Sequence, residues 1–218
     1  MENKFIVSSS PHIRSNEDTS YIMKQVILAL VPVAIAAVYY FRISALFVMF
    51  FCILGTVGSE FLYQKLTKQK STIGDCSAIV TGLLLAFNVP ASLPWWMCIL
   101  GGVFAIIVVK MLFGGLGNNF VNPALAGRAF LLASFPVGMT AWTKTGVNWV
   151  SSGSLDAVST ATPLSFLKSG AAGLAPLKES GVSLMDMALG NIGGCVGETC
   201  AILILLGGLY LIYKGIIS

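Results

Sequence analysis

The sequence predicts an all-α integral membrane protein, a polytopic helical bundle, and three features of the 218-residue chain indicate this fold class. Hydrophobic residues make up 56% of the chain and charged residues only 10%, whereas a soluble domain carries about 25% charged residues. Several apolar runs approach the roughly 20 residues that a helix needs to cross a bilayer. Stretches rich in glycine and proline separate these runs.

The first half of the chain contains two long apolar runs and a shorter one. Residues 1–21 are polar and are expected to form a cytoplasmic segment ahead of the first helix. The runs 22–41 and 43–66 predict membrane spans, with a tight turn at Arg42 between them. The run 75–88 is too short to cross the bilayer core as a helix. It predicts a half-helix that is buried among its neighbours rather than exposed to lipid.

Further spans follow in the second half. The apolar segment 93–112 begins with paired tryptophans, which are typical of the headgroup boundary. Glycines end this span, and Asn122 before Pro123 predicts the capped start of a new helix that reaches about Phe135. The last span is expected over 197–213.

These boundaries divide the chain into four parts. After the segment 1–21 we expect a first membrane bundle over 22–136, with about five helical segments of which one is short. An external loop is expected over 137–189 and a further transmembrane helix over 190–218.

Basic residues predict the orientation, because cytoplasmic loops carry an excess of lysine and arginine. Lys4, Arg14 and Lys24 place the amino terminus inside the cell. Two spans then return the chain to the lysines of 65–70, which are also expected inside. Continued alternation places the loop 137–189 outside.

Charged side chains within the apolar segments are candidate functional residues, because burying a charge in the bilayer costs a few kcal/mol. Glu60, Asp75 and Glu198 are candidates for an ion path. Lys110 is a further candidate functional residue, and the alternative is that it extends its ammonium group towards the membrane surface. Arg128 is expected to form an internal ion pair or to bind the anionic group of a ligand.

Two stretches, 55–60 and 194–198, are alike because each places small residues before a glutamate. They indicate either an internal repeat, as transporter folds have, or two helices that pack closely through glycine. Cys195 and Cys200 flank Glu198, but scattered cysteines in membrane proteins mostly act as small hydrophobic residues, so we predict no metal site. The basic residues are spread along the chain, which disfavours nucleic-acid binding.

The loop 137–189 is several times longer than a turn between membrane helices requires, and such loops are usually functional or disordered. It contains the stretch 156–164, with the sequence DAVSTATPL. Pro163 favours an extended backbone at Thr162, which would hold the threonine hydroxyl away from any helix. On the residue pattern alone, the simpler interpretation is a loop whose hydroxyls only contact water.

This stretch resembles the flavin-attachment motif of RnfD, a membrane component of the Rnf electron-transport complex. The same motif occurs in the component designated B of the sodium-pumping NADH:quinone reductase. The resemblance implies that Thr162 carries FMN through a phosphodiester bond. It also implies that a separate flavin transferase recognises Asp156, Ser159 and Ala161. Thr160 stands where the family often has glycine, so a second hydroxyl lies close to the attachment position.

The similarity extends over nearly the whole chain. The stretches 75–86, 114–128 and 190–194 are similar to signature segments of RnfD and have the same order around the flavin motif. The resemblance implies the first half of an inverted-repeat transporter-like fold plus one helix. Family members have about ten spans in two inverted halves, so we expect this chain, with about six, to be a truncated form.

The resemblance further implies a subunit of an ion-translocating ferredoxin:NAD⁺ oxidoreductase in the inner (cytoplasmic) membrane, active only within the complex. It would pass electrons at the outer face through FMN, coupled to Na⁺ or H⁺ transport. Arg128 is a further candidate for cofactor binding, and the quinone-reductase relative suggests a second, non-covalent flavin such as riboflavin.

The implied partners are the other subunits of the complex, including a second FMN-bearing subunit, together with the flavin transferase and the lipid bilayer. Two alternatives from other functional classes stay open. One is a permease without redox chemistry, and the other is a scaffold subunit whose loop docks partners and carries no cofactor.

Overall fold

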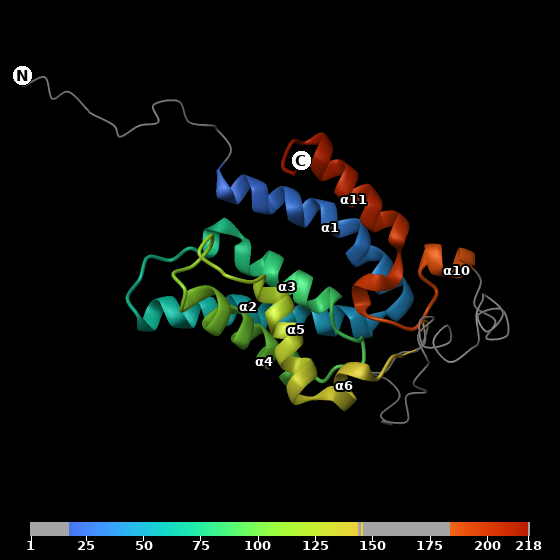
Figure 1. Ribbon diagram of the computed structural model, residues 1–218, viewed down its shortest axis with the longest axis horizontal. Helices are drawn as coiled ribbons and strands as arrows, with labels where there is room; N and C mark the ends of the chain where they lie inside the picture. The colour runs from blue at the N-terminus through green and yellow to red at the C-terminus, as the bar shows by residue number, and fades with distance from the viewer. Residues whose placement is uncertain (1–17, 144, 146–183, 218) are drawn as a thin grey trace, which may run out of the picture.

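The computed structural model describes residues 18–143, 145 and 184–217, and every named element in this part of the chain is helical (Figure 1). Helix α1 (Thr19–Phe41) has 23 residues and α2 (Ile43–Leu66) has 24. Both are long and apolar enough to cross a membrane. The helices predicted over 22–41 and 43–66 are therefore confirmed, with α1 beginning three residues earlier than predicted.

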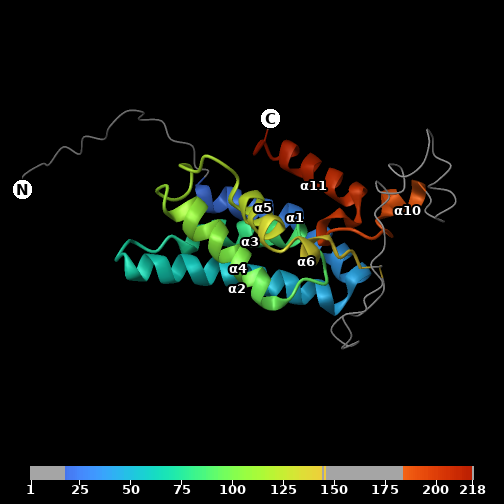
Figure 2. The ribbon, with the colours of Figure 1, turned by 60° about the horizontal axis from the view of Figure 1, so that its bottom comes forward.

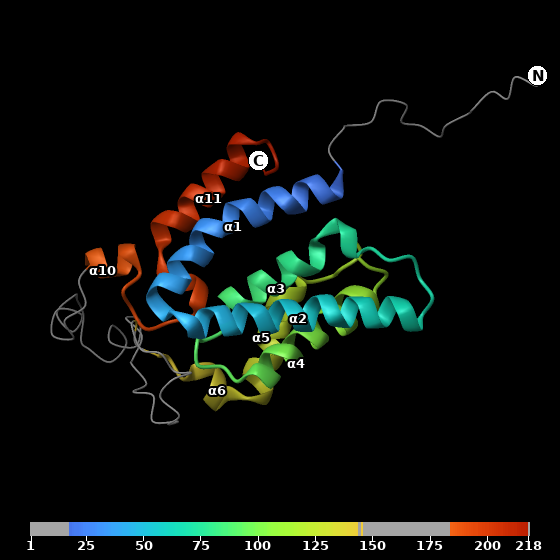
Figure 3. The ribbon, with the colours of Figure 1, turned by 180° about the vertical axis from the view of Figure 1, so that it is seen from behind.

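The predicted half-helix is also confirmed. The short η1 (Ile73–Asp75) leads into α3 (Ser77–Phe87), and Cys76 joins them in the left-handed region with a φ of 63°. With 11 residues, α3 spans only part of the bundle. Its buried face packs on α2, as Figure 3 shows.

The span predicted over 93–112 is one continuous helix whose first part is α-helical and whose second part is π-helical. It begins as α4 (Trp95–Val103) and continues as the π-helical η2 (Phe104–Met111). After a glycine-rich turn, α5 (Pro123–Ser134) begins at the predicted cap, where Asn122 Oδ1 accepts a 3.0 Å hydrogen bond from the Ala124 amide. The short α6 (Pro136–Thr140) follows.

The last part of the chain contains α10 (Leu184–Leu189), η3 (Val196–Thr199) and α11 (Ala201–Tyr213). The last helix begins at Ala201 and not at the predicted Gly197. The difference arises because η3 is a 3₁₀ turn and Cys200 after it is extended, with a φ of −153°. Helix α11 lies beside α1, and the three ribbon views agree on this (Figure 2).

One end of the bundle, which we call the basic end, contains the start of α1 and the ends of α2, η2 and α11. Ser20 Oγ donates a 3.2 Å hydrogen bond to the Gly74 carbonyl there, and Tyr210 Oη donates a 2.5 Å hydrogen bond to Gln25 Oε1. The described lysines near this end are Lys24, Lys65, Lys68, Lys70, Lys110 and Lys214.

The opposite end, which we call the loop end, contains the end of α1, α6 and α10. Tyr40 Oη donates a 2.8 Å hydrogen bond to the Leu189 carbonyl, and Ser92 Oγ donates a 2.9 Å hydrogen bond to the Ala141 carbonyl. The described residues on either side of the range 146–183, Thr145 and the start of α10, therefore both lie at this end (Figure 1).

Glycines allow the central helices to approach closely. A Cβ atom at Gly55 would lie 2.9 Å from Ile99 Cα, and one at Gly82 would lie 2.8 Å from Ile53 Cα. A Cβ atom at Gly197 would lie 2.5 Å from Phe87 Cβ. Close packing of a helix through glycine is thus confirmed for the stretch 55–60, at Gly55. The stretch 194–198 also packs closely at Gly197, but it forms a 3₁₀ turn and not a helix, and the internal repeat stays a prediction.

Candidate functional site

The residues of the flavin motif, Asp156, Ser159, Thr160, Ala161 and Thr162, lie outside the described residues. The other predicted site residues separate into two polar clusters. Glu60 and Asp75 lie near the basic end, whereas Arg128 and Glu198 lie near the loop end. The ion-path candidates Glu60, Asp75 and Glu198 are therefore not gathered into one site.

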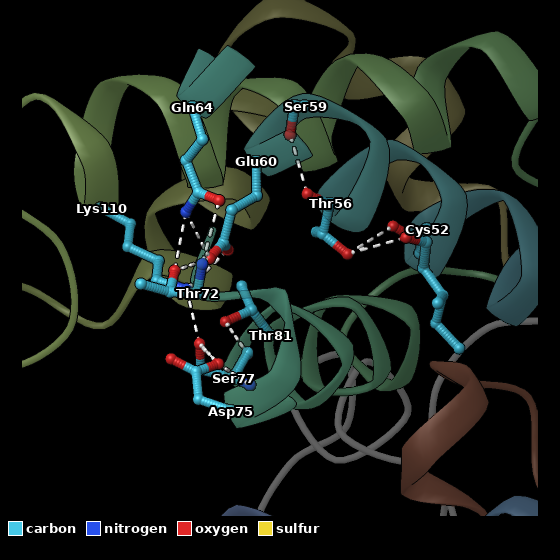
Figure 4. Close-up of polar contacts among 11 residues, drawn as sticks. Cys52, Thr56, Ser59, Glu60, Gln64, Thr72, Asp75, Ser77, Thr81 and Lys110 are labelled. Atoms are coloured by element: carbon cyan, nitrogen blue, oxygen red, sulfur yellow. Dashed lines mark hydrogen bonds and ion pairs between the residues drawn. The ribbon is translucent and has the colours of Figure 1, made fainter. Parts of the chain in front are cut away.

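A buried ion pair forms the centre of the basic-end cluster (Figure 4). Glu60 on α2 is fully buried and Lys110 on η2 is 2% exposed, and Lys110 Nζ lies 2.6 Å from Glu60 Oε2. The alternative that Lys110 extends to the membrane surface is wrong. The ammonium group finds acceptors inside the bundle, because it also donates a 2.6 Å hydrogen bond to Ser77 Oγ.

Ser77 connects this pair to the second predicted carboxylate. Its hydroxyl donates a 2.6 Å hydrogen bond to Asp75 Oδ1, and its amide donates a 2.8 Å hydrogen bond to the same oxygen. Asp75 thus satisfies an amide in the first turn of α3, which has no intrahelical acceptor. A chain of hydrogen bonds runs from the Lys110 ammonium through the Ser77 hydroxyl to the half-buried Asp75 carboxylate.

The other carboxylate oxygen of Glu60 has different partners. Thr72 Oγ1 donates a 2.8 Å hydrogen bond to Glu60 Oε1, and Gln64 Nε2 donates to the same atom over 3.2 Å. Gln64 also holds Thr72 in place, since Gln64 Oε1 accepts a 3.1 Å hydrogen bond from the Thr72 amide. Both oxygens of this buried carboxylate are therefore hydrogen-bonded, as a buried charge requires.

A polar cavity of about 730 Å³ opens beside this cluster at the basic end. Gln64, Thr72 and Asp75 line it, together with the residues 18–20, 69–71 and 114–116. The buried Glu60 carboxylate is consequently one side chain away from a space that a hydrated ion could enter. Figure 4 shows Gln64, Thr72 and Asp75 surrounding the ion pair.

The hydroxyls further along α2 and α3 bond within their own helices. Thr56 Oγ1 donates to the Cys52 carbonyl over 3.1 Å, and Thr81 Oγ1 donates to the Ser77 carbonyl over 2.9 Å. Such bonds back to the preceding turn satisfy a hydroxyl inside an apolar bundle. Glu60, Lys110 and Asp75 are therefore the charged side chains of this cluster, and Thr56 and Thr81 are uncharged neighbours on α2 and α3 (Figure 4).

The loop-end cluster is organised around Arg128. Its Nη1 donates a 3.1 Å hydrogen bond to Asn88 Oδ1, and its Nη2 lies 3.9 Å from Cys195 Sγ. Arg128 forms no ion pair with any residue in the described ranges. The exposed Glu198 instead accepts a 3.0 Å hydrogen bond from the Cys195 amide. Of the two expectations for Arg128, the internal ion pair is absent from the described structure and the ligand role stays a prediction.

The electrostatic surroundings of Cys195 keep its thiol protonated. Burial, and then the neighbouring Glu198 carboxylate, raise the pKa of this thiol to about 12, although Arg128 acts in the opposite direction. Cys195 therefore acts as a packing residue near neutral pH, in agreement with the interpretation of the cysteines as small hydrophobic residues.

Sequence reasoning missed several residues that complete the two clusters. Gln64 follows Glu60 by four residues, a spacing that places both on one helix face, so that signal was available. Ser77 is the first residue of the half-helix α3 and Asn88 follows its last, positions where unpaired backbone groups favour polar residues. Thr72 had no signal, because it lies in a connection whose path the sequence does not define.

Comparisons with known proteins show which family the chain belongs to. The model of the NQR2, RnfD, RnfE family matches residues 6–218. The component designated D of the Na⁺-translocating ferredoxin:NAD⁺ oxidoreductase complex from Acetobacterium woodii is 49% identical over 219 residues, which cover 100% of this chain and 65% of the relative. The component designated D of the proton-translocating complex from Clostridium ljungdahlii is 44% identical over 221 residues, with the same coverage of 100% and 65%.

A third relative matches a shorter part of the chain. The component designated D of the ion-translocating oxidoreductase complex from Shigella boydii is 46% identical over 140 residues, which cover 63% of this chain and 40% of the relative. The chain spans 65% of the length of the two relatives that match all of it. Because the family model matches nearly every residue, this chain belongs to the NQR2, RnfD, RnfE family.

Proposed function

We propose that this chain is an electron-carrying membrane subunit of an Rnf-type ferredoxin:NAD⁺ oxidoreductase, with FMN covalently bound to Thr162. One observation carries the proposal. The flavin-attachment motif 156–164 occurs within a family match that covers residues 6–218. The relatives that match the whole chain are the components designated D of such complexes.

The described structure supports a flavin at the loop end. Thr145 and Asn191 flank the segment that contains Thr162, and their side chains share a 2.5 Å hydrogen bond at this end of the bundle. Arg128 contributes a positive charge here without a carboxylate partner in the described ranges. We propose that it attracts the anionic group of a flavin, either FMN or a non-covalent riboflavin in its reduced form.

FMN supplies electron transfer when it is bound, and the chain's own residues supply attachment and placement. The Thr162 hydroxyl oxygen would form the phosphoester. Asp156, Ser159 and Ala161 would be recognised by the flavin transferase. The neighbouring Thr160 would stay free.

The basic-end cluster supports an ion path with an entrance at Asp75 and Glu60. The cavity gives a hydrated cation access to Asp75, and Glu60 is a carboxylate deeper in the bundle. Glu198 is proposed as an ion contact at the loop end. The two relatives that match the whole chain belong to complexes described as Na⁺-translocating and proton-translocating, so we propose Na⁺ or H⁺ as the coupling ion.

The gathering of lysines at one end supports the proposed orientation in the cytoplasmic membrane, with the basic end inside and the segment 137–189 outside. We also propose the division into the segment 1–21, the bundle 22–136, the loop 137–189 and the helix region 190–218. The other subunits of the complex, including a second FMN-bearing subunit, are the proposed partners.

In-gel fluorescence tests the covalent flavin. The protein is produced in a host that contains the flavin transferase, denatured, and separated on a gel. The wild type and Thr160→Ala should fluoresce as flavoproteins, and Thr162→Ala should not. A wild type without fluorescence would instead favour a cofactor-free permease or a scaffold subunit, and a fluorescent Thr162→Ala would move the attachment to another residue.

A further inference from the structure

We propose that the ammonium group of Lys110 competes with the transported cation for the Glu60 carboxylate. A small monovalent cation that comes from the basic-end cavity must contact this carboxylate, which Lys110 already occupies. The inference rests on the ion path proposed above. It assigns Lys110 the role of a positioning residue that sets how tightly the path holds its ion.

The first argument is that stability alone does not account for the pair. Glu60 and Lys110 are both withdrawn from water, and their charged atoms lie 2.6 Å apart. The desolvation of two charges commonly equals or exceeds their mutual attraction, so apolar residues of similar volume often serve stability as well. The presence of both charged residues is consistent with a role in which Glu60 and Lys110 exchange each other for other binding partners.

The second argument is that the two oxygens of Glu60 face different partners. Lys110 holds Oε2, whereas Oε1 contacts Thr72 and Gln64, which line the cavity. A cation that arrives from the cavity therefore meets Oε1 and the Thr72 hydroxyl oxygen, which are the hard oxygen donors that small cations prefer. The Gln64 amide nitrogen, which donates to both of these oxygens, turns away when the cation binds. The carboxylate is approached by the transported cation on one side and by the tethered ammonium on the other.

The third argument is that Lys110 has a second acceptor to move to. Two positive charges at one carboxylate repel each other, so an arriving cation weakens the hold of Glu60 on Lys110. Ser77 Oγ already accepts a 2.6 Å hydrogen bond from the ammonium, and the Asp75 carboxylate lies directly behind Ser77. The ammonium can therefore shift towards Asp75 while the cation takes Glu60, and total charge is preserved.

The helix that carries Lys110 has unusual geometry that suits such a shift. η2 is π-helical over Phe104–Met111, and the Leu112 amide bonds to the Ile107 carbonyl five residues back over 3.1 Å. π-turns are rare and frequently occur at functional sites. A return of this segment to α-helical register would rotate Lys110 relative to Glu60.

Steady-state turnover of the assembled complex in membrane vesicles tests the inference. Ferredoxin-dependent NAD⁺ reduction is measured against Na⁺ at fixed pH, and against pH without Na⁺, so that the two arms identify the coupling cation. Lys110→Met removes the competitor, and the half-saturating cation concentration should fall at least tenfold. In the proton arm the half-saturating proton concentration should likewise fall at least tenfold, a displacement of the rate profile by one pH unit or more towards alkaline pH, because the proton no longer competes with the ammonium group for Glu60.

Lys110→Arg is the second variant, because Lys110→Met leaves a buried carboxylate unpaired and can fail to assemble. A guanidinium group can bind both carboxylate oxygens, so Lys110→Arg should raise the half-saturating concentration at least threefold. Lys24→Met is the control, because it removes an exposed lysine from the same end and should leave the half-saturating concentration unchanged.

The outcomes separate this inference from the proposed function. A half-saturating concentration in Lys110→Arg equal to that of the wild type overturns the role of Lys110, whether or not Lys110→Met assembles, and leaves the ion path intact. A wild-type rate that depends on neither Na⁺ nor pH overturns the ion path and the inference together. Covalent flavin on Thr162 is unaffected by either result.

Discussion

Glu60 and Lys110 neutralise each other inside the bundle, so each residue determines the effect of changing the other. Glu60→Gln leaves a buried ammonium and Lys110→Met leaves a buried carboxylate. Either change should destabilise the protein by about 3–5 kcal/mol. The double variant Glu60→Gln/Lys110→Met removes both charges and should be closer in stability to the wild type than either single variant.

Thermal unfolding of the purified protein in detergent measures this double-mutant cycle. The control is Lys24→Met, an exposed lysine whose loss should change stability by less than about 0.5 kcal/mol. Additive effects of the two single changes would contradict the ion pair.

Cys195 makes a second prediction at the scale of single residues. With a thiol pKa of about 12, roughly one molecule in ten thousand carries the thiolate at pH 8. Iodoacetamide should therefore modify the partly exposed Cys76 and leave Cys195 unmodified at pH 8. Labelling of Cys195 should increase as the pH rises towards the pKa, because the thiolate fraction grows tenfold per unit. Peptide mapping that found equal labelling of both cysteines at pH 8 would show that Cys195 is not buried as described.

Helix α2 offers a matched pair of glycines for testing how the elements pack. A methyl group at Gly55 would lie 2.9 Å from both Cα and the carbonyl oxygen of Ile99, whereas one at Gly58 would meet nothing within 4 Å. Gly55→Ala should destabilise the protein by about 1–3 kcal/mol, because backbone atoms of α4 must move. Gly58→Ala should be neutral or stabilise by up to about 1 kcal/mol, because alanine favours helix.

Thermal unfolding of the two variants in the same detergent makes the comparison. Equal effects of Gly55→Ala and Gly58→Ala would contradict the close contact between α2 and α4.

The sequence predicted the helices well because membrane helices have strong signals. The apolar length of 43–66 gave α2 without error, and Asn122 before Pro123 gave the start of α5. The start of α11 was missed because glycine at 197 permits both a helix and a 3₁₀ turn. Close packing against Phe87, which no local pattern reveals, accompanies the turn that forms there.

The candidate site was predicted less completely, for a physical reason. The rarity of charge in apolar segments identified Glu60, Asp75 and Arg128 as notable residues. Their partners are determined by which helices meet, and residues 50 positions apart in sequence, such as Glu60 and Lys110, become neighbours only after folding. The sequence therefore left two alternatives for Lys110, a functional role or an extension to the membrane surface, although its partner was already among the candidates.

At the scale of the whole molecule, the two ends differ in charge, and this predicts which side each faces. In a variant without its native cysteines, Ser71→Cys at the basic end should react with a membrane-impermeant maleimide only after the cells are permeabilised. Val137→Cys, an 83% exposed position on α6 at the loop end, should react in intact cells. The reverse pattern would place the flavin motif on the cytoplasmic side.

The proposed function places its two parts at opposite ends of the molecule, with the Glu60–Lys110 cluster at the basic end and Thr145 and α10, which flank the segment that contains Thr162, at the loop end. Helices α1 and α2 extend between these ends, and large apolar side chains such as Ile35, Phe50 and Leu205 stay exposed along the bundle. Such surfaces suit contact with lipid or with other subunits. Coupling between electrons and ions would therefore act across the length of the bundle.

Mass spectrometry of the native protein, made together with its flavin transferase, tests the central claim most directly. The peptide that contains 156–164 should be heavier by one FMN less one water, and fragmentation should place the added mass on Thr162. The same peptide from Thr162→Ala should have its unmodified mass. An unmodified Thr162 in the native protein would contradict the assignment of this chain as a flavin-carrying subunit.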